Sequence, residues 1–395
     1  MATTLRFNQT INVPRAVVYK AFTHPNLLDQ WLCSGAQVDL REGGFFFYTW
    51  NEGFYIAGIF QTLEKNSRIV QSWRVMYEPI GSTMETVLTG DGDVTHVEVI
   101  MHIDHDGRFD GTEEGWRRSL GDLKYLLETG FDQRLMTRPM LGIYPGGLDD
   151  ERAARLGLTG VKGVYINDVI AGMGAASVLQ HDDVLVSLGG MPVTDFPSLQ
   201  TAVGRHKGGD VVPVEFYRAG SKHSADMLLS KRPVPELPAT PSALAEVLRG
   251  QLAELRGELD TLLAGVPDSV TSSRPNPTEW SVNDNLAHLL WTERTYQGWL
   301  FNIVGGNGQI VWMDNNDLHL VMSTAVYPTT ADLVTEWERS LAAIIAEVEA
   351  LPADFAAIKP FFNLIAFGLT NDERHTREHF EQIRRTIAAI TQPTT

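Results

Sequence analysis

The chain has 395 residues and a formal net charge of -17, from 49 acidic and 32 basic side chains. Its content of 43% hydrophobic and 21% charged residues is ordinary for a folded protein, and its length allows two or three domains. The acidic excess argues against binding to nucleic acid or to an anionic membrane, because both partners require clustered Lys and Arg.

Cysteine usage and the N-terminus bear on the cellular compartment. The single cysteine, Cys33, excludes a disulfide within the chain and fits a reducing environment. The first residues lack the apolar core of a signal peptide, and no run is long and apolar enough to span a bilayer. We therefore expect a cytoplasmic protein.

Glycine and proline divide the chain into segments. Of the 35 glycines, 27 precede Pro235 and 8 follow it, which indicates a turn-rich and strand-rich first part and a helical last part. Four prolines between residues 233 and 241 predict an extended linker. We expect domains at residues 1–130, 138–232 and 242–391. The linker at 233–241 joins the second domain to the third.

The first segment is predicted to combine an antiparallel sheet with helices. A strand over 5–13 alternates apolar and polar residues, and a short helix follows Pro14. Aromatic-rich strands then alternate with turns, and an amphipathic helix over 112–129 closes the segment. The expected strands after the first lie at 44–50, 54–63, 69–76, 82–88 and 95–103.

This order resembles the START-like helix-grip fold of the SRPBCC superfamily, in its Hsp-ATPase-activator-like branch. The resemblance rests on residues 11–23, on Leu28-Asp29-Gln30-Trp31 and on Gly115-Trp116. It implies an apolar cavity between sheet and helix that holds a small apolar ligand. The aromatic candidates for its lining are Trp31, Phe47, Trp50, Tyr55 and Trp73. The same side chains can simply fill the core, where large aromatics usually lie.

The second segment resembles a PDZ domain of the bacterial HtrA-like kind. The resemblance rests on residues 138–143, 163–176 and 179–193. Backbone N–H groups around Leu141 and Gly142 can converge on a carboxylate, and an extended peptide can add to the strand that starts at Ile143. The predicted peptide-binding residues are Arg138, Met140, Leu141, Gly142, Ile143, Leu199 and Val203. The alternative is a PDZ fold that serves only as a spacer or docking face.

The third segment reads as an antiparallel four-helix bundle. Apolar stripes predict helices over 243–263, 280–299, 331–351 and 361–390, with Ser281 as an N-cap. The long connection from 302 to 330 is expected to cover one end of the bundle. Its candidate covering residues are Trp312, Asn315, Asn316 and His319. The fold class is thus multidomain: an α+β helix-grip domain, a PDZ β-sandwich or barrel-like domain, and an all-α bundle.

Three histidines stand out in the bundle. His375 and His379 are four positions apart. Two such positions on a helix differ by about 40° in direction and by about 6 Å along the axis, so both rings share one face. His288 lies in a second apolar helical stretch and is expected to point inward too. Imidazole suits zinc or nickel, and three protein ligands leave one position open, as in catalytic sites. We predict a divalent metal bound by His288, His375 and His379, although three histidines hydrogen-bonded to protein groups remain the alternative.

A carboxylate can orient a metal-binding histidine by accepting a hydrogen bond from the ring nitrogen that does not bind the metal. Four carboxylates near these histidines in sequence are candidates for this role. They are Glu293, Glu373, Glu378 and Glu381.

Residues 278–289 and 375–383 resemble the two motifs of the DinB/YfiT-like superfamily. The resemblance implies that the three histidines bind a divalent metal. It further implies a metal-dependent transferase that uses a low-molecular-weight thiol, activated as a thiolate. The alternative is a non-enzymatic adaptor, stress-related or co-chaperone-like, that joins a ligand cavity, a peptide-binding module and a metal-bearing bundle.

Overall fold

The computed structural model describes residues 3–51, 53–76, 81–103, 112–277, 279–305 and 317–391. His105, Thr278, Trp312, Asn315 and Asn316 lie outside the described residues. The chain divides into two compact units, one formed by Met1–Phe131 with Glu236–Thr395 and the other by Asp132–Pro235. Among the described helices, none combines the length and the apolarity that crossing a membrane requires.

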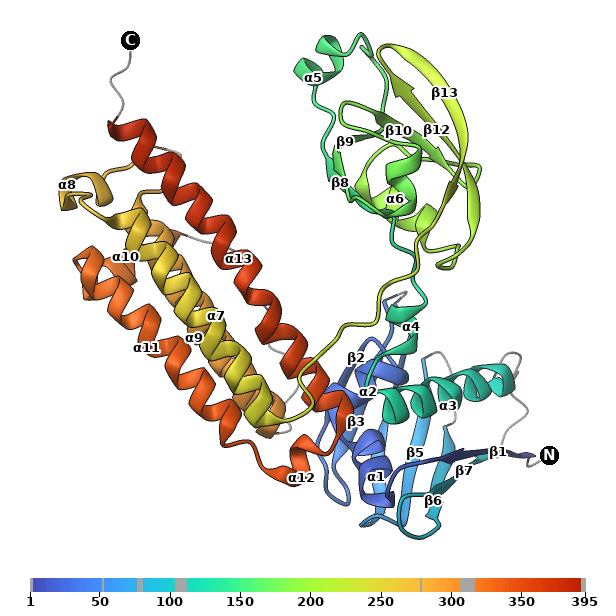
Figure 1. The fold of residues 1–395 in the computed structure, drawn as a ribbon. Coiled ribbons are helices and arrows are strands. Elements are labelled where there is room, and N and C mark those ends of the chain that lie inside the picture. The colour runs from blue at the N-terminus through green and yellow to red at the C-terminus, as the bar shows by residue number, and fades with distance from the viewer. Residues whose placement is uncertain are drawn as a thin grey trace. The chain divides into compact units, whose positions relative to one another are not determined.

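The first segment contains a seven-stranded antiparallel sheet with the strand order β1-β7-β6-β5-β4-β3-β2 (Figure 1). The strands are β1 (Thr3–Ile11), β2 (Gly35–Val38), β3 (Phe45–Thr49), β4 (Tyr55–Glu64), β5 (Arg68–Val75), β6 (Ser82–Thr89) and β7 (Thr95–Ile103). Three helices accompany them: α1 (Arg15–Thr23), α2 (Pro25–Trp31) and α3 (Thr112–Thr129). Trp116 on α3 contacts Phe7 and Trp73 of the sheet, so the predicted sheet-and-helix arrangement is confirmed.

The second unit is a small sheet with the order β13-β12-β10-β9-β8, in which β11 pairs with β10. Its elements are α4 (Gln133–Met136), β8 (Ile143–Gly146), α5 (Asp150–Arg155), β9 (Val164–Val169), the 3-10 helix η1 (Gly174–Ser177), β10 (Val184–Leu188), β11 (Met191–Pro192), α6 (Phe196–Val203), β12 (Val211–Arg218) and β13 (Ser221–Leu228). A separate apolar cluster fills it. The predicted β-sheet PDZ region is confirmed, and β8 forms one edge of its sheet.

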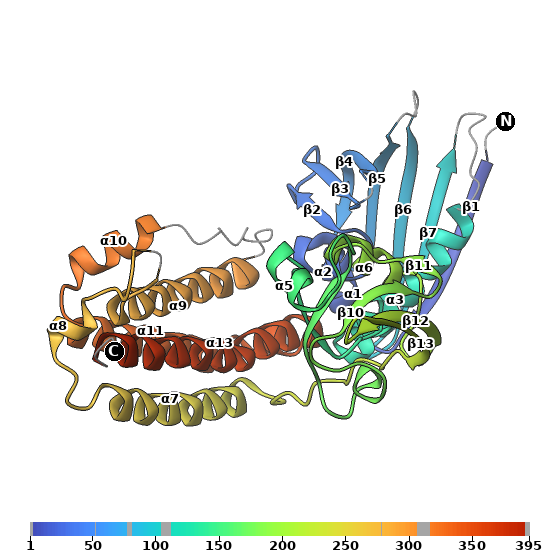
Figure 2. The ribbon, with the colours of Figure 1, turned by 90° about the horizontal axis from the view of Figure 1, so that it is seen from above.

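The C-terminal segment is all-helical, as predicted. Its elements are α7 (Pro241–Leu263), α8 (Asp268–Thr271), α9 (Val282–Gly305), α10 (Asp317–Val326), α11 (Thr330–Glu349), α12 (Ala353–Ala356) and α13 (Lys359–Thr391). The four long helices α7, α9, α11 and α13 run side by side in both views (Figures 1 and 2). Residues from all four form the buried core of the bundle.

The start of α9 is fixed by a reciprocal cap. Ser281 Oγ accepts a hydrogen bond from the Asp284 backbone N–H at 3.0 Å, and Asp284 Oδ2 accepts one from the Ser281 N–H at 2.9 Å. Arg274 Nε donates to the same carboxylate oxygen at 2.8 Å. These contacts satisfy N–H groups that the first helical turn leaves open, and they confirm Ser281 as the N-cap. The helix that carries His288 therefore begins at a defined point.

Within the first unit, the sheet segment and the bundle share buried side chains. One apolar cluster includes Leu28 and Trp31 together with Leu300 of α9 and Phe361 of α13. The Lys359 ammonium also donates to the backbone carbonyl of Glu128 at 2.8 Å. The two segments are thus continuous through their cores.

Candidate metal centre

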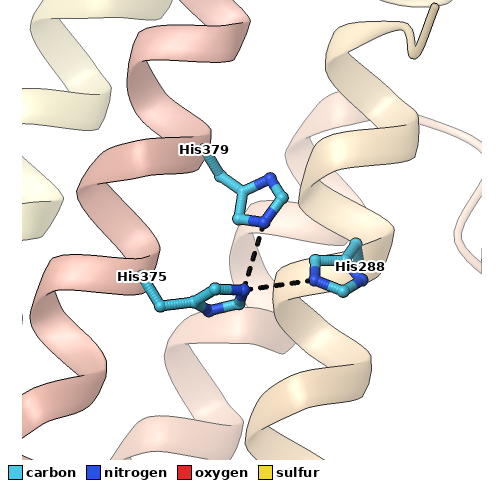
Figure 3. Close-up of side chains that lie close together, drawn as sticks. All are labelled: His288, His375 and His379. Carbon is cyan, nitrogen blue, oxygen red and sulfur yellow. Dashed lines mark hydrogen bonds between the residues drawn. The ribbon is translucent and has the colours of Figure 1, made fainter. Parts of the chain in front are cut away.

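Helices α9 and α13 bring the three predicted histidine ligands together (Figure 3). The Nε2 atom of His375 lies 3.3 Å from Nε2 of His288 and 3.2 Å from Nε2 of His379. One ring nitrogen from each histidine lies within 4.8 Å of the other two. Two successive turns of α13 supply His375 and His379, and α9 supplies His288 from across the bundle.

Three converging imidazole nitrogens do not satisfy one another. A nitrogen of a neutral imidazole either donates one hydrogen or accepts one. Nε2 of His375 faces two other Nε2 atoms, so it can form one good hydrogen bond and leaves the second contact unmatched. A cation at the centre would use all three lone pairs at once, which is the donor set of a three-histidine site.

The hydrogen-bond partner of Nδ1, the ring nitrogen of His379 that points away from the cluster, determines the tautomer of His379. Nδ1 of His379 lies 2.9 Å from Oδ1 of Asn285. The amide nitrogen of Asn285 donates to the Ser281 carbonyl at 2.9 Å, which assigns the oxygen to the histidine side. Nδ1 of His379 is therefore the donor, and its Nε2 lone pair points into the cluster. A metal-binding imidazole needs this tautomer.

His375 faces a carboxylate through its own outer nitrogen. Nδ1 of His375 lies 3.7 Å from Oδ1 of Asp372, one turn earlier on α13. This distance is too long for a hydrogen bond, and neither atom has another partner among the described residues. Asp372 in turn lies beside Glu293, whose pKa is raised well above its ordinary value by burial and then by the charge of Asp372. One buried carboxyl group thus faces His375, and a second lies beside that carboxyl group.

Burial keeps His288 and His379 in the neutral form that binds metals. Burial, and then the charges of the neighbouring histidines, lower the pKa of His288 to about 3. Burial likewise lowers the pKa of His379 to about 4. Both rings are therefore uncharged near pH 7. Trp280 packs against them, stacked on His379 with ring centroids 6.0 Å apart and lying 5.2 Å from His288.

The glutamates predicted to orient these rings are engaged elsewhere, so that prediction is wrong. Glu373 accepts from Gln251 and Arg377, Glu378 lies 3.7 Å from Arg374, and Glu381 pairs with Arg384. Glu293 faces Asp372 rather than a histidine.

Asn285 and Asp372 take the places expected for those glutamates. Each stands three positions before a histidine of the cluster, on the same helix face. Asn285, however, faces His379 on the other helix rather than His288, so its spacing in the sequence does not point to this contact.

Five of the predicted peptide-binding residues lie at or before the start of β8, and the other two, Leu199 and Val203, lie on α6. Gly142 adopts a φ of +75°, and a Cβ added there would lie 2.4 Å from Cβ of Met173, so the position requires glycine. Met140 pairs with Ser230 in an isolated bridge. Leu141, Ile143 and Val203 are partly buried against the PDZ core, Leu199 is fully within it, and Arg138 is exposed.

The five aromatics predicted to line one cavity lie in two places. Trp31 and Trp73 are buried in the core beneath the sheet, and Trp50 packs against the same cluster. Phe47 and Tyr55 contact each other with ring centroids 5.4 Å apart, and Tyr55 is 40% exposed. Alternate residues of β3 face opposite sides of the sheet, and Phe46 and Tyr48 occupy the core side. Phe47 and Tyr55 therefore lie on the outer face and cannot line a cavity under α3.

Models of three protein families match successive parts of the chain. The model described as "Activator of Hsp90 ATPase homolog 1-like protein" matches residues 12–128. The PDZ domain model matches residues 139–229, and the DinB superfamily model matches residues 251–383.

Two curated relatives match shorter stretches. The serine protease Do-like HtrA of Lactococcus lactis subsp. lactis (strain IL1403) is 35% identical over 102 residues, covering 24% of this chain and 25% of that protein. The activator of 90 kDa heat shock protein ATPase homolog of Dictyostelium discoideum is 30% identical over 122 residues, covering 30% of this chain and 31% of that protein. The chain thus spans about a quarter to a third of the length of these relatives.

Two solved structures align with part of the chain. An Hsp90 activator from Plasmodium falciparum is 23% identical, with a TM-score of 0.29, covering 32% of this chain and 96% of that one. Protein MLL2253 of Mesorhizobium loti is 22% identical, with a TM-score of 0.30, covering 32% of this chain and 97% of that one. Together with the family models, the curated relatives support a chain of three successive parts, similar to Hsp90 ATPase activator homologues, to PDZ domains and to the DinB superfamily.

Proposed function

We propose that the bundle binds one divalent metal ion through Nε2 of His288, His375 and His379. The observation that carries this proposal is the convergence of three Nε2 atoms from two helices, with contacts of 3.2 and 3.3 Å at His375. The tautomer of His379 and the neutral state of the buried rings support it, because both leave lone pairs directed at one point.

The bound ion would supply a Lewis-acidic position with one coordination site open to a thiol or water. The chain's own residues hold and orient the imidazoles: Asn285 fixes the ring of His379, and Trp280 packs over His379 and His288. Zinc and nickel are the ions that this donor set favours.

The reaction that we propose is transfer to or from a low-molecular-weight thiol. The similarity of residues 251–383 to the DinB superfamily supports it. The arginines nearest the cluster in sequence are already paired: Arg377 with Glu373 and Glu258, and Arg374 with Glu378. A small thiol without a large anionic group therefore suits this centre better than a highly charged one.

Metal content tests the proposal directly. We expect about one zinc or nickel ion per purified chain by elemental analysis, and loss of the ion in the double variant His375→Ala, His379→Ala, because one remaining imidazole binds weakly. His102→Ala, on β7 outside the cluster, is the matched control and should keep its metal. Stoichiometric metal in the double variant would contradict the proposal.

A second candidate function is peptide binding by the PDZ unit without turnover. The observation that favours it is that β8 is an edge strand beginning one residue after the positive-φ Gly142, so a peptide could extend the sheet. Thiol consumption in the presence of an electrophile, measured with and without added metal, separates the two candidates. Metal-dependent turnover supports the enzyme, and peptide capture alone supports the adaptor.

A further inference from the structure

Each histidine of the cluster needs a partner for its outer ring nitrogen. A metal-binding imidazole that uses Nε2 carries its hydrogen on Nδ1, and this N–H is almost always donated to an acceptor that fixes the ring. Asn285 fills that role for His379, and Asp372 faces Nδ1 of His375. Nδ1 of His288 is buried and has no hydrogen-bond partner anywhere in the described part of the chain.

A fourth histidine lies beside the ring of His288. The ring of His319, on α10, lies 5.8 Å from the ring of His288 and 4.8 Å from that of Trp291, centroid to centroid. Its Nε2 atom is also buried and has no hydrogen-bond partner within the described ranges. The neighbouring Leu320 is 1% exposed in the bundle core, so α10 is anchored where it presents His319.

The unmatched atoms are chemically complementary. Nδ1 of a metal-binding His288 is a donor, and Nε2 of a neutral His319 that carries its hydrogen on Nδ1 is an acceptor. Apart from the cluster's own histidines and His319, the rings described against His288 are Trp280 and Trp291, which offer only an indole N–H donor. A buried donor left without an acceptor costs about 1–3 kcal/mol, so a contact between these two nitrogens is favoured.

We propose that His319 is a positioning residue of the metal centre, whose Nε2 accepts a hydrogen bond from Nδ1–H of His288. It holds the His288 ring in the tautomer and orientation that direct Nε2 at the ion. With Asn285 bonded to His379 and Asp372 facing His375, His319 would give the third imidazole a polar group at its Nδ1. This inference rests on the proposed metal centre and adds a residue to it.

Zinc affinity of the full chain tests the role of His319. We expect His319→Leu, which fills the space without an acceptor, to weaken zinc binding about 10-fold to 100-fold in a chelator competition. His319→Gln should stay within about threefold of the wild type, because its amide oxygen can reach the position of Nε2. Circular dichroism of the metal-free proteins checks that both variants fold alike.

Ring-nitrogen NMR of the zinc-loaded wild type supplies a second readout. We expect His288 to be protonated at Nδ1 and His319 to be protonated at Nδ1 with a free, hydrogen-bonded Nε2. A protonated Nε2 on neutral His319 would overturn the proposal, since that nitrogen could not accept.

Three affinity outcomes are distinct. Wild-type affinity in folded His319→Leu would overturn the role of His319 alone. Equal weakening in His319→Gln and His319→Leu would also overturn it, because the loss would then reflect packing. A wild-type chain that binds no zinc would instead overturn the proposed metal centre itself.

Discussion

The side-chain amide of Asn285 determines the tautomer and the orientation of the His379 ring. Asn285 is fully buried, donates to the Ser281 carbonyl at 2.9 Å and faces Nδ1 of His379 with its oxygen at 2.9 Å. The side chain of Asn285 therefore connects the N-cap residue Ser281 of α9 to the ring of His379 on α13. The orientation of the His379 ring thus depends on the backbone carbonyl of Ser281, at the start of the other helix.

Replacing Asn285 should therefore weaken metal binding. We expect Asn285→Leu to lower zinc affinity about 10-fold to 100-fold, because the His379 ring loses the acceptor that selects its tautomer. Isothermal titration of the metal-free chain with zinc measures the change. Asn302→Ala is the control, since Asn302 lies on the same helix and, within the described ranges, its side chain donates to the Gly298 carbonyl of that helix. Unchanged affinity in Asn285→Leu would show that the contact does not orient the ligand.

The three histidines of the site could be found from the sequence, whereas their surroundings could not. The four-residue spacing of His375 and His379 places both rings on one face whatever the tertiary structure. Asn285, Asp372 and His319 carry no such signal, because the relevant contacts cross from one helix to another or depend on rotamers. Counting carboxylates near the histidines in sequence favoured three glutamates that pair with arginines and a fourth, Glu293, that faces Asp372.

At the scale of elements, the sequence predicts the long helices, whose apolar periodicity is strong. It does not predict the short strand β2 or the short helix α2. The apolar stripes of α7, α9, α11 and α13 predict four helices, and all four are present. The edge strand β2 has only four residues, Gly35–Val38, and its composition gives little β propensity. The seven-residue α2 begins at Pro25 directly after α1, so no separate pattern marks it.

The loop before β8 contains the carboxylate-binding position that we predict for the PDZ unit. We expect Gly142→Val to abolish binding of C-terminal peptides, because a β-branched residue is strained at a φ of +75° and its Cβ would collide with Met173. Fluorescence anisotropy with a labelled peptide library measures binding. Gly147→Ala, where a Cβ meets nothing within 4 Å, is the control. Retained binding in a folded Gly142→Val variant would exclude this loop as the carboxylate site.

At the scale of the molecule, the sequence indicates separate segments, but the first and last share one apolar cluster. The contacts involve single residues far apart in the chain, such as His24 and Phe361, whose rings lie 4.4 Å apart. Periodicity reports which face of an element is apolar and not which element covers it. The shared core was therefore outside what sequence patterns can predict.

His24 should make the stability of this shared core depend on pH. Burial lowers the pKa of His24 to about 4 despite a backbone hydrogen bond with Ile303, whereas in the unfolded chain it is about 6.5. Between these values the unfolded state binds a proton that the folded state does not, so the free energy of unfolding falls as pH decreases from 6.5 to 4. The full window corresponds to about 3 kcal/mol.

The contribution of His24 can be separated from that of other buried histidines by difference. His24→Gln cannot titrate, so its urea-measured free energy of unfolding should fall less than that of the wild type between pH 7 and pH 4.5. His96→Gln, at an exposed position on β7, is the control and should follow the wild type. Parallel pH profiles for His24→Gln and the wild type would mean that His24 is accessible to protons in the folded chain, and the contact with Phe361 would then not bury it as described.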